Sequence, residues 1–114
     1  MKLEIKAIPP SLNKVLRMHW GAKRDLRDNW ILLIRSALSG AYLKPIVKMR
    51  VKVTLHHSRL YDEDNAMGAC KVIFDALKHW HLIYDDNPAF LEAHVEQVKC
   101  THKQRKTVIE LEAA

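Results

Sequence analysis

Residues 47–56 decide the fold, and they read Val-Lys-Met-Arg-Val-Lys-Val-Thr-Leu-His. Apolar and polar residues alternate along this stretch without interruption. Because successive side chains of a β-strand point to opposite faces of a sheet, the alternation predicts a strand with one buried and one solvent-facing side. The polar side carries Lys48, Arg50 and Lys52. This basic stripe is open to two interpretations, a phosphate-tracking surface and an ordinary solvated sheet face.

The segments on either side of this strand complete an α+β pattern. Residues 2–8 and 91–96 also alternate, and residues 107–112 predict a fourth strand after a basic, hairpin-like turn at 101–106. Residues 22–39 and 65–78 have apolar positions at helical spacing, with Gly40 suited to cap the first of these helices, whereas residues 11–21 show no pattern. The order predicts a small mixed sheet of about four strands with two helices packed on one face.

Length and composition predict a single domain that spans residues 1–114, because one hydrophobic core of roughly this size is the commonest unit. A hydrophobic content of 48% with only 3 Gly and 4 Pro excludes a disordered chain. No apolar run reaches the ~18 residues of a membrane helix, and the N-terminus lacks the apolar core of a signal peptide. We therefore expect a cytoplasmic protein without a membrane partner. Cys70 and Cys100 form no CxxC pair, so reduced thiols are expected.

The charges are unevenly distributed along the chain. Six of the 13 acidic residues lie between Asp62 and Asp86, where Lys71 and Lys78 are the basic residues, so this stretch carries −4 and the remainder +10. Clustered carboxylates in a basic protein indicate divalent-metal chemistry on a polyanion. The pI near 9.5 favours an acidic partner such as nucleic acid, although it is also explained as charge for solubility.

The spacing of the carboxylates suggests a metal site. Asp62 and Asp64 are two residues apart, so in an extended stretch both side chains point the same way and reach one ion. If the chain doubles back after the second helix, Asp85 or Asp86 supplies a third carboxylate. Three such oxygen ligands with water suit Mg²⁺, with Mn²⁺ as the alternative. The alternative interpretation is a helix cap at Asp62 and a turn at Asp85 and Asp86.

Lys71 follows Asp64 by seven residues, which on one continuous helix brings it to within about 20° of the direction of Asp64. An ammonium group beside a metal and carboxylates stabilises charge on a phosphate during cleavage. Lys71 is equally able to form an ordinary ion pair with Asp75, four residues further on.

Taken together, the motifs resemble the RusA family of Holliday junction resolvases, which are Mg²⁺-dependent endodeoxyribonucleases of bacteria and their phages. The likeness rests on residues 9–13 (Pro-Pro-Ser-Leu-Asn), on Asp62-x-Asp64-Asn65, on Lys71 with residues 74–77 (Phe-Asp-Ala-Leu), and on the Asp85-Asp86 pair. It implies that Asp62, Asp64 and Asp86 bind the metal, that Lys71 is essential, and that a homodimer nicks two strands symmetrically. The spacing from Asn65 to Lys71 is longer than in the usual family pattern, so Lys71 is the least secure of these assignments.

We therefore expect a Mg²⁺-dependent endonuclease, bacterial or phage-encoded, that resolves four-way junctions or other branched DNA by paired phosphodiester cleavage. Basic residues in predicted turns, or beside the family-like segments, are the expected DNA contacts: Lys14, Arg17, Lys23, Arg24, Lys103, Arg105 and Lys106. The alternatives are a branched-DNA-binding protein without catalytic turnover and a metal-dependent nucleotide phosphohydrolase.

Overall fold

The computed structural model describes residues 1–38 and 46–114 of the chain. The last residue of the first predicted helix, Ser39, and its expected cap, Gly40, lie outside these ranges. In chain order the elements are β1 (Lys2–Ile5), α1 (Leu12–Leu16), α2 (Trp20–Ala37), β2 (Met49–His57), α3 (Glu63–Ala69), α4 (Lys71–His79), β3 (Leu91–Lys99), the 3₁₀ turn η1 (His102–Gln104) and β4 (Lys106–Ala113).

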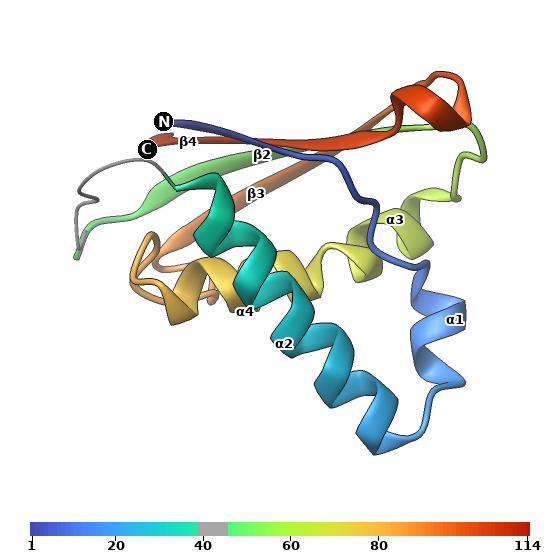
Figure 1. Ribbon diagram of the computed structural model, residues 1–114. Coiled ribbons are helices and arrows are strands. Elements are labelled where there is room, and N and C mark those ends of the chain that lie inside the picture. Colours follow the sequence, from blue (N-terminus) through green and yellow to red (C-terminus); the bar gives the residue numbers. More distant parts are fainter. Residues whose placement is uncertain (39–45) are drawn as a thin grey trace.

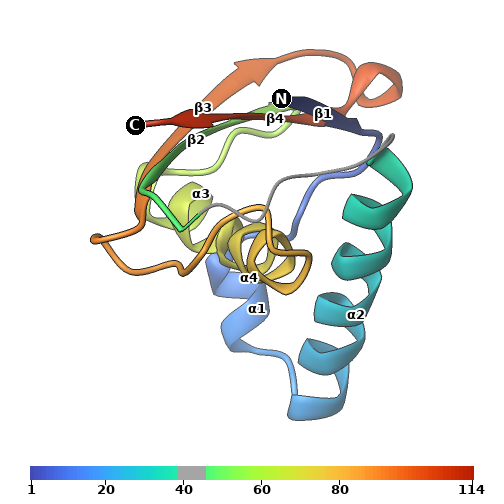
Figure 2. The same ribbon diagram turned by 90° about the vertical axis from the view of Figure 1, so that its left-hand side faces the viewer.

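The four strands form one mixed sheet in the order β1-β4-β2-β3. β4 runs antiparallel to both β1 and β2, whereas β3 runs parallel to β2, with Met49 opposite Leu91 and His57 opposite Lys99. The helices lie on one face of this sheet, as the two views in Figures 1 and 2 show. The predicted α+β class is therefore confirmed.

The turn at residues 101–106 does not close a hairpin. η1 connects β3 to β4, but β2 lies between these two strands in the sheet. This order gives β2 a hydrogen-bonded neighbour on each side, which suits a strand whose Val51, Val53 and Leu55 are fully buried. The expectation of a hairpin was wrong because short local sequence does not report which strands become neighbours.

The helices differ from the predicted pair in two places. α1 was not predicted, because five residues are too few to show a periodic pattern; the hydroxyl of Ser11 caps it by accepting from the backbone N–H of Lys14 at 3.3 Å. The second predicted helix is two helices, α3 and α4, which meet at Cys70.

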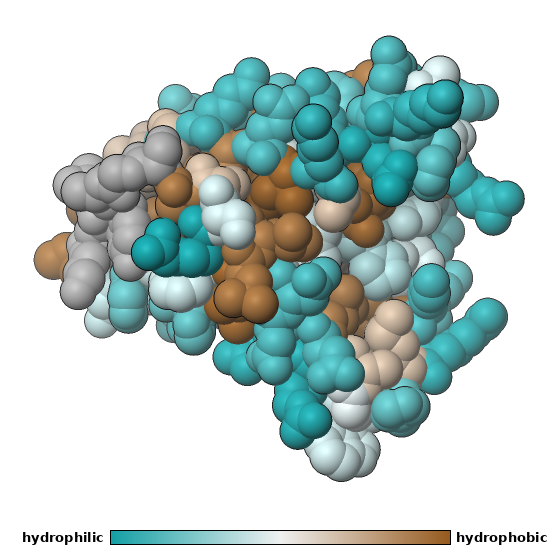
Figure 3. Space-filling model, in the orientation of Figure 1, coloured by the Kyte–Doolittle hydropathy of each residue, from teal (hydrophilic) through white to brown (hydrophobic). Residues whose placement is uncertain are grey.

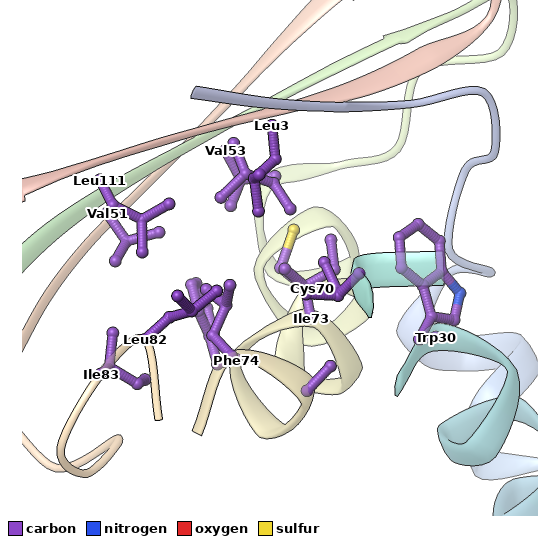
Figure 4. Close-up of a cluster of buried hydrophobic side chains, with 14 of the residues drawn as sticks. Leu3, Trp30, Val51, Val53, Cys70, Ile73, Phe74, Leu82, Ile83 and Leu111 are labelled. Carbon is purple, nitrogen blue, oxygen red and sulfur yellow. The ribbon is translucent and has the colours of Figure 1, made fainter. Parts of the chain in front are cut away.

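The core lies between the sheet and the helices α2 and α4. Figure 4 shows Val51, Val53 and Leu111 of the sheet facing Ile73 and Phe74 of α4. α4 is also tied to α2, because the indole N–H of Trp80 donates to the carbonyl of Ile31 at 2.7 Å.

Cys70, at the junction of α3 and α4, belongs to this core. Burial raises the pKa of its thiol to about 12, so the thiol stays protonated and poorly reactive at neutral pH. In the described ranges both cysteines are free thiols. None of the helices in these ranges has the length and apolar character needed to cross a membrane.

Candidate functional site

Two segments that carry the family-like motifs meet at the start of α3. The backbone N–H of Asn13 donates to Oδ1 of Asn65 at 3.0 Å, although 52 residues separate them. The hydroxyl of Tyr61 donates to the carbonyl of Pro9 at 3.0 Å. Residues 9–13 and 61–65 therefore form a single structural unit, which we call the motif junction.

Asp62 lies at the centre of the motif junction and caps α3. Its Oδ1 accepts from the backbone N–H of Asn65 and its Oδ2 from the Asn65 amide, both at 2.9 Å. Because Asn65 also accepts from Asn13, the orientation of the Asp62 carboxylate depends on the start of α1 as well as on α3.

The cap changes the expected relation between Asp62 and Asp64. Asp62 has extended backbone angles, but the helix already begins at Glu63, so Asp64 lies in the first helical turn. The assumption of an extended stretch from Asp62 to Asp64 was wrong, because the cap satisfies an N–H of the first turn and lets the helix start early. Asp62 is the N-cap and Asp64 lies inside the helix, so the two carboxylates are not side chains on the same side of one extended stretch. The acidic residues of this turn also complement the positive end of the helix dipole.

Close packing of α1 on α3 holds the motif junction together. A Cβ atom placed on Gly68 of α3 would lie only 2.7 Å from both Cβ and Cδ2 of Leu12 in α1. Real Cβ atoms do not come this close to other carbons, so only glycine permits the observed contact.

Gln97, on β3, holds the backbone of Tyr61 beside Asp62. Its Oε1 accepts from the Tyr61 N–H and its Nε2 donates to the Tyr61 carbonyl, both at 2.8 Å. These two bonds fix which end of the amide is oxygen. Nε2 of His57 lies 2.9 Å from the same oxygen and must therefore carry the proton of that hydrogen bond.

No feature of the sequence pointed to Gln97 or to His57 as part of the site. Gln97 follows directly after the predicted strand at residues 91–96, and its partner Tyr61 is 36 residues away. An amide side chain at the end of a strand is too common to indicate a site.

Asp85 and Asp86 form a turn between α4 and β3. Oδ1 of Asp85 lies 3.1 Å from Nζ of Lys78 and accepts from the Asp86 N–H at 2.7 Å, while its Oδ2 accepts from the Asn87 amide at 3.1 Å. The hydrogen bond from Lys78, followed by that from the Asp86 backbone, lowers the pKa of Asp85. Asp85 is thus committed to the turn, whereas Asp86 is exposed.

Asp62 and Asp86 lie at opposite ends of β3. Tyr61, next to Asp62, is bonded to Gln97, whereas Asn87, next to Asp86, accepts from the Leu91 N–H at 2.9 Å. Six residues of strand separate Gln97 from Leu91, or about 20 Å. In Figure 1 the chain accordingly starts α3 at one end of the sheet and leaves α4 at the other.

The topology explains this separation. β3 is parallel to β2, so the connection must return to the end of the sheet where β2 began. A residue just after β2 and one just before β3 are therefore placed at opposite ends. Within residues 1–38 and 46–114, no group of three or more His, Cys, Asp or Glu side chains can hold a metal ion. One chain does not bring Asp62, Asp64 and Asp86 together as expected.

Lys71 begins α4, beyond the break at Cys70, so the continuous helix assumed for its alignment with Asp64 is absent. Its Nζ lies 3.8 Å from Oδ1 of Asp75, in the i, i+4 pair that was the alternative interpretation, and its side chain is 74% exposed. An essential role for Lys71 stays a prediction.

The predicted DNA contacts fall into two groups. Lys14 and Arg17 belong to α1 and its C-cap, and Lys23 and Arg24 lie in the first turns of α2. Lys103 lies in η1, Arg105 is its C-cap, and Lys106 begins β4. Of these seven residues, Lys106 is engaged in an ion pair, with Glu4 at 2.8 Å.

Two of the three residues of the basic stripe form ion pairs on the open face of the sheet. Arg50 pairs with Glu92 and, at 3.0 Å, with Glu112, and Lys52 pairs with Glu96 at 3.4 Å. The hydrogen bonds that Arg50 donates to the carboxylates of Glu92 and Glu112 raise the pKa of Arg50. These pairs favour the solvated sheet face over a phosphate-tracking surface.

Comparison with known protein families and with curated proteins found no match to this sequence.

Proposed function

We propose that this protein is a Mg²⁺-dependent endonuclease that cleaves branched DNA, with the action of a Holliday junction resolvase. The observation that carries the proposal is the motif junction. Two segments with family-like sequence, far apart in the chain, are hydrogen-bonded around the carboxylate of Asp62. The net charge of +6 supports a polyanionic substrate.

The carboxylates at the start of α3 fit Mg²⁺ as part of a larger donor set. Each carboxylate oxygen of Asp62 accepts one hydrogen bond and keeps a second lone pair. Mg²⁺ is held in proteins by one or two carboxylates together with water and substrate phosphates, and Mn²⁺ accepts similar ligands. Asp62 and Asp64 would hold the ion, which supplies an activated water and neutralises charge on the phosphate.

A homodimer supplies the missing carboxylate. β3 is an edge strand of the sheet, and two such edges related by a two-fold axis pair antiparallel. That arrangement places the Leu91 end of one strand beside the Gln97 end of the other. Asp86 of one copy then approaches Asp62 and Asp64 of the second copy, which gives two equivalent sites for two symmetric nicks.

Cleavage of a synthetic four-way junction tests this function. With Mg²⁺, the protein is expected to make paired, symmetric nicks that disappear with a chelator and with Asp64→Asn. Glu63→Gln, a neighbouring acidic residue outside the proposed donor set, is the matched control and is expected to cleave normally. Normal nicking by Asp64→Asn would remove the proposed mechanism.

A second candidate is a branched-DNA-binding protein without turnover. It is favoured by the absence of a three-residue metal group from the described part of the chain. It predicts tight, salt-sensitive junction binding that is indifferent to chelator and produces no nicks.

A further inference from the structure

A groove of about 630 Å³ lies beside the motif junction. Its walls come from four places: residues 8–18, Leu26 of α2, the end of β2 with the loop that follows it, and η1 with Arg105. Its volume falls within the roughly 300–1,000 Å³ of typical ligand sites. These walls lie at the end of the molecule where Figure 3 shows mostly hydrophilic side chains over α1 and η1.

The groove is positively charged. Lys14, Arg59 and Arg105 line it together with His57 and His102, and no carboxylate is among the lining residues. Within the described ranges, none of the two arginines and the lysine makes an ion pair, in contrast to Arg50 and Lys52 on the sheet face. An accessible concave surface that is lined by positive charges attracts a polyanion.

One hydrogen bond orients the guanidinium of Arg105 in this groove. Its Nη1 donates to the carbonyl of His102 at 2.9 Å, which leaves the other guanidinium N–H groups free to donate to a ligand. A planar guanidinium donates two parallel hydrogen bonds to a phosphate, which makes arginine well suited to this anion.

The remaining lining suits a nucleotide strand better than a free anion. Ile8, Met18, Leu26 and Tyr61 give the groove apolar surface between its cations. A DNA strand alternates in the same way, with charged phosphates and less polar sugars and bases. Tyr61 precedes Asp62, so a strand lying in the groove continues to the acidic start of α3.

We propose that this groove binds the phosphodiester backbone of one DNA strand and leads it to Asp62. Lys14 and Arg105 were expected as DNA contacts from the sequence, whereas Arg59 and His102 were not. The inference rests on the proposed action on DNA, but it concerns binding and not cleavage.

Fluorescence anisotropy with a labelled four-way junction, in chelator so that no cleavage occurs, tests the groove. Arg59→Gln and Arg105→Gln are each expected to weaken binding about tenfold and to reduce the slope of log affinity against log salt by ~0.7–0.9 per lost phosphate contact. Arg50→Gln and Lys52→Gln, which remove equal charge from the ion-paired sheet face, are matched controls expected to change affinity less than about twofold. Circular dichroism checks folding, and Lys14→Gln replaces any variant that does not fold.

Equal effects of the groove variants and the sheet-face controls would overturn the inference, because net charge alone would then explain binding. Competition by polyglutamate as effective as that by DNA would also overturn it, since the groove would then be a general polyanion site. Binding through the groove without Mg²⁺-dependent nicks would leave the inference standing and remove the nuclease proposal. Groove variants that bind the junction and nick it like the wild type would overturn the groove inference and leave the nuclease proposal standing.

Discussion

At the scale of single residues, Asp62 serves two purposes that substitutions can separate. Its carboxylate caps α3 through the backbone N–H of Asn65, and under the proposed function it also contacts the metal. Asparagine is as good a cap as aspartate but carries no charge, whereas alanine removes both the cap and the charge.

Asp62→Ala is expected to lower the free energy of unfolding by about 1–2 kcal/mol, because the first turn of α3 loses its cap. Asp62→Asn keeps the bond to the Asn65 N–H and loses only the one from the Asn65 side chain, so its cost is expected to be less than half as large. Urea unfolding measures both. Both variants are expected to lose junction nicking; an active Asp62→Asn protein would show that the charge has no catalytic role.

Gln97 is the second residue whose contribution to stability follows from its contacts. Gln97→Leu has similar size but leaves the Tyr61 N–H, the Tyr61 carbonyl and His57 without their partner. The free energy of unfolding is expected to fall by about 1–3 kcal/mol, measured by urea unfolding. Gln104→Leu, at an exposed position of η1, is the control and is expected to stay within about 0.5 kcal/mol of the wild type. Equal stability of the two variants would contradict the structural role of Gln97.

At the scale of elements, the contact between α1 and α3 determines how the motif junction is built. α1 alone is too short to be stable in water, so its position depends on packing against α3. Gly68 allows this packing, because its missing side chain makes room for Leu12.

Gly68→Ala is expected to destabilise the protein by about 1–3 kcal/mol through overpacking. At an exposed helical position the same change would stabilise by up to ~1 kcal/mol, so the sign of the effect tests the contact. In a Leu12→Gly background, which removes the three contacting atoms, the substitution is expected to become neutral or stabilising. Urea unfolding of the wild type, the two single variants and the double variant gives the coupling free energy between residues 12 and 68. Additive changes in the free energy of unfolding would contradict the close contact.

The elements also show how far sequence reasoning reaches. Alternation predicted three of the four strands, the fourth was expected at residues 107–112, and helical spacing predicted α2 to within two residues at its start. The break at Cys70 was invisible, because an apolar cysteine fits a helical pattern as well as a helix junction. Strand order and the bonds from Gln97 to Tyr61 depend on contacts between distant residues, which local patterns do not encode. The acidic residues of the candidate site were chosen from sequence, but their distribution over two ends of the sheet follows from the parallel pairing of β2 with β3.

At the scale of the whole molecule, a site shared between two subunits predicts that two inactive variants can complement each other, whereas a site within one chain does not. Asp64→Asn and Asp86→Asn are each expected to be inactive alone. In a mixed dimer, one of the two sites combines Asp62 and Asp64 of one copy with Asp86 of the other, and none of these three is substituted. Mixing the two inactive proteins is therefore expected to restore nicking of one strand per junction.

Nicked-circle and cleavage assays on a plasmid-borne four-way junction distinguish single from paired nicks. The matched control mixes Asp64→Asn with Asp62→Asn, whose substitutions fall in the same half of the site, and no activity is expected. Failure of the first mixture, with subunit exchange shown by sedimentation of tagged chains, would exclude the shared site.

The position of β4 has a consequence for how the chain acquires its structure. β4 pairs on one side with β1, where Leu3 faces Ile109, and on the other with β2. The ribosome makes residues 106–113 after both of the strands that they join, so β1 and β2 have no common neighbour until these residues have been made. Before residues 106–113 are made, β3 is the only strand neighbour of β2 in the described sheet that the nascent chain contains. A large sequence separation between strand partners, such as that between β1 and β4, slows folding. Helices α1 to α4 are complete by then, and they provide the surface on which the late strand closes the sheet.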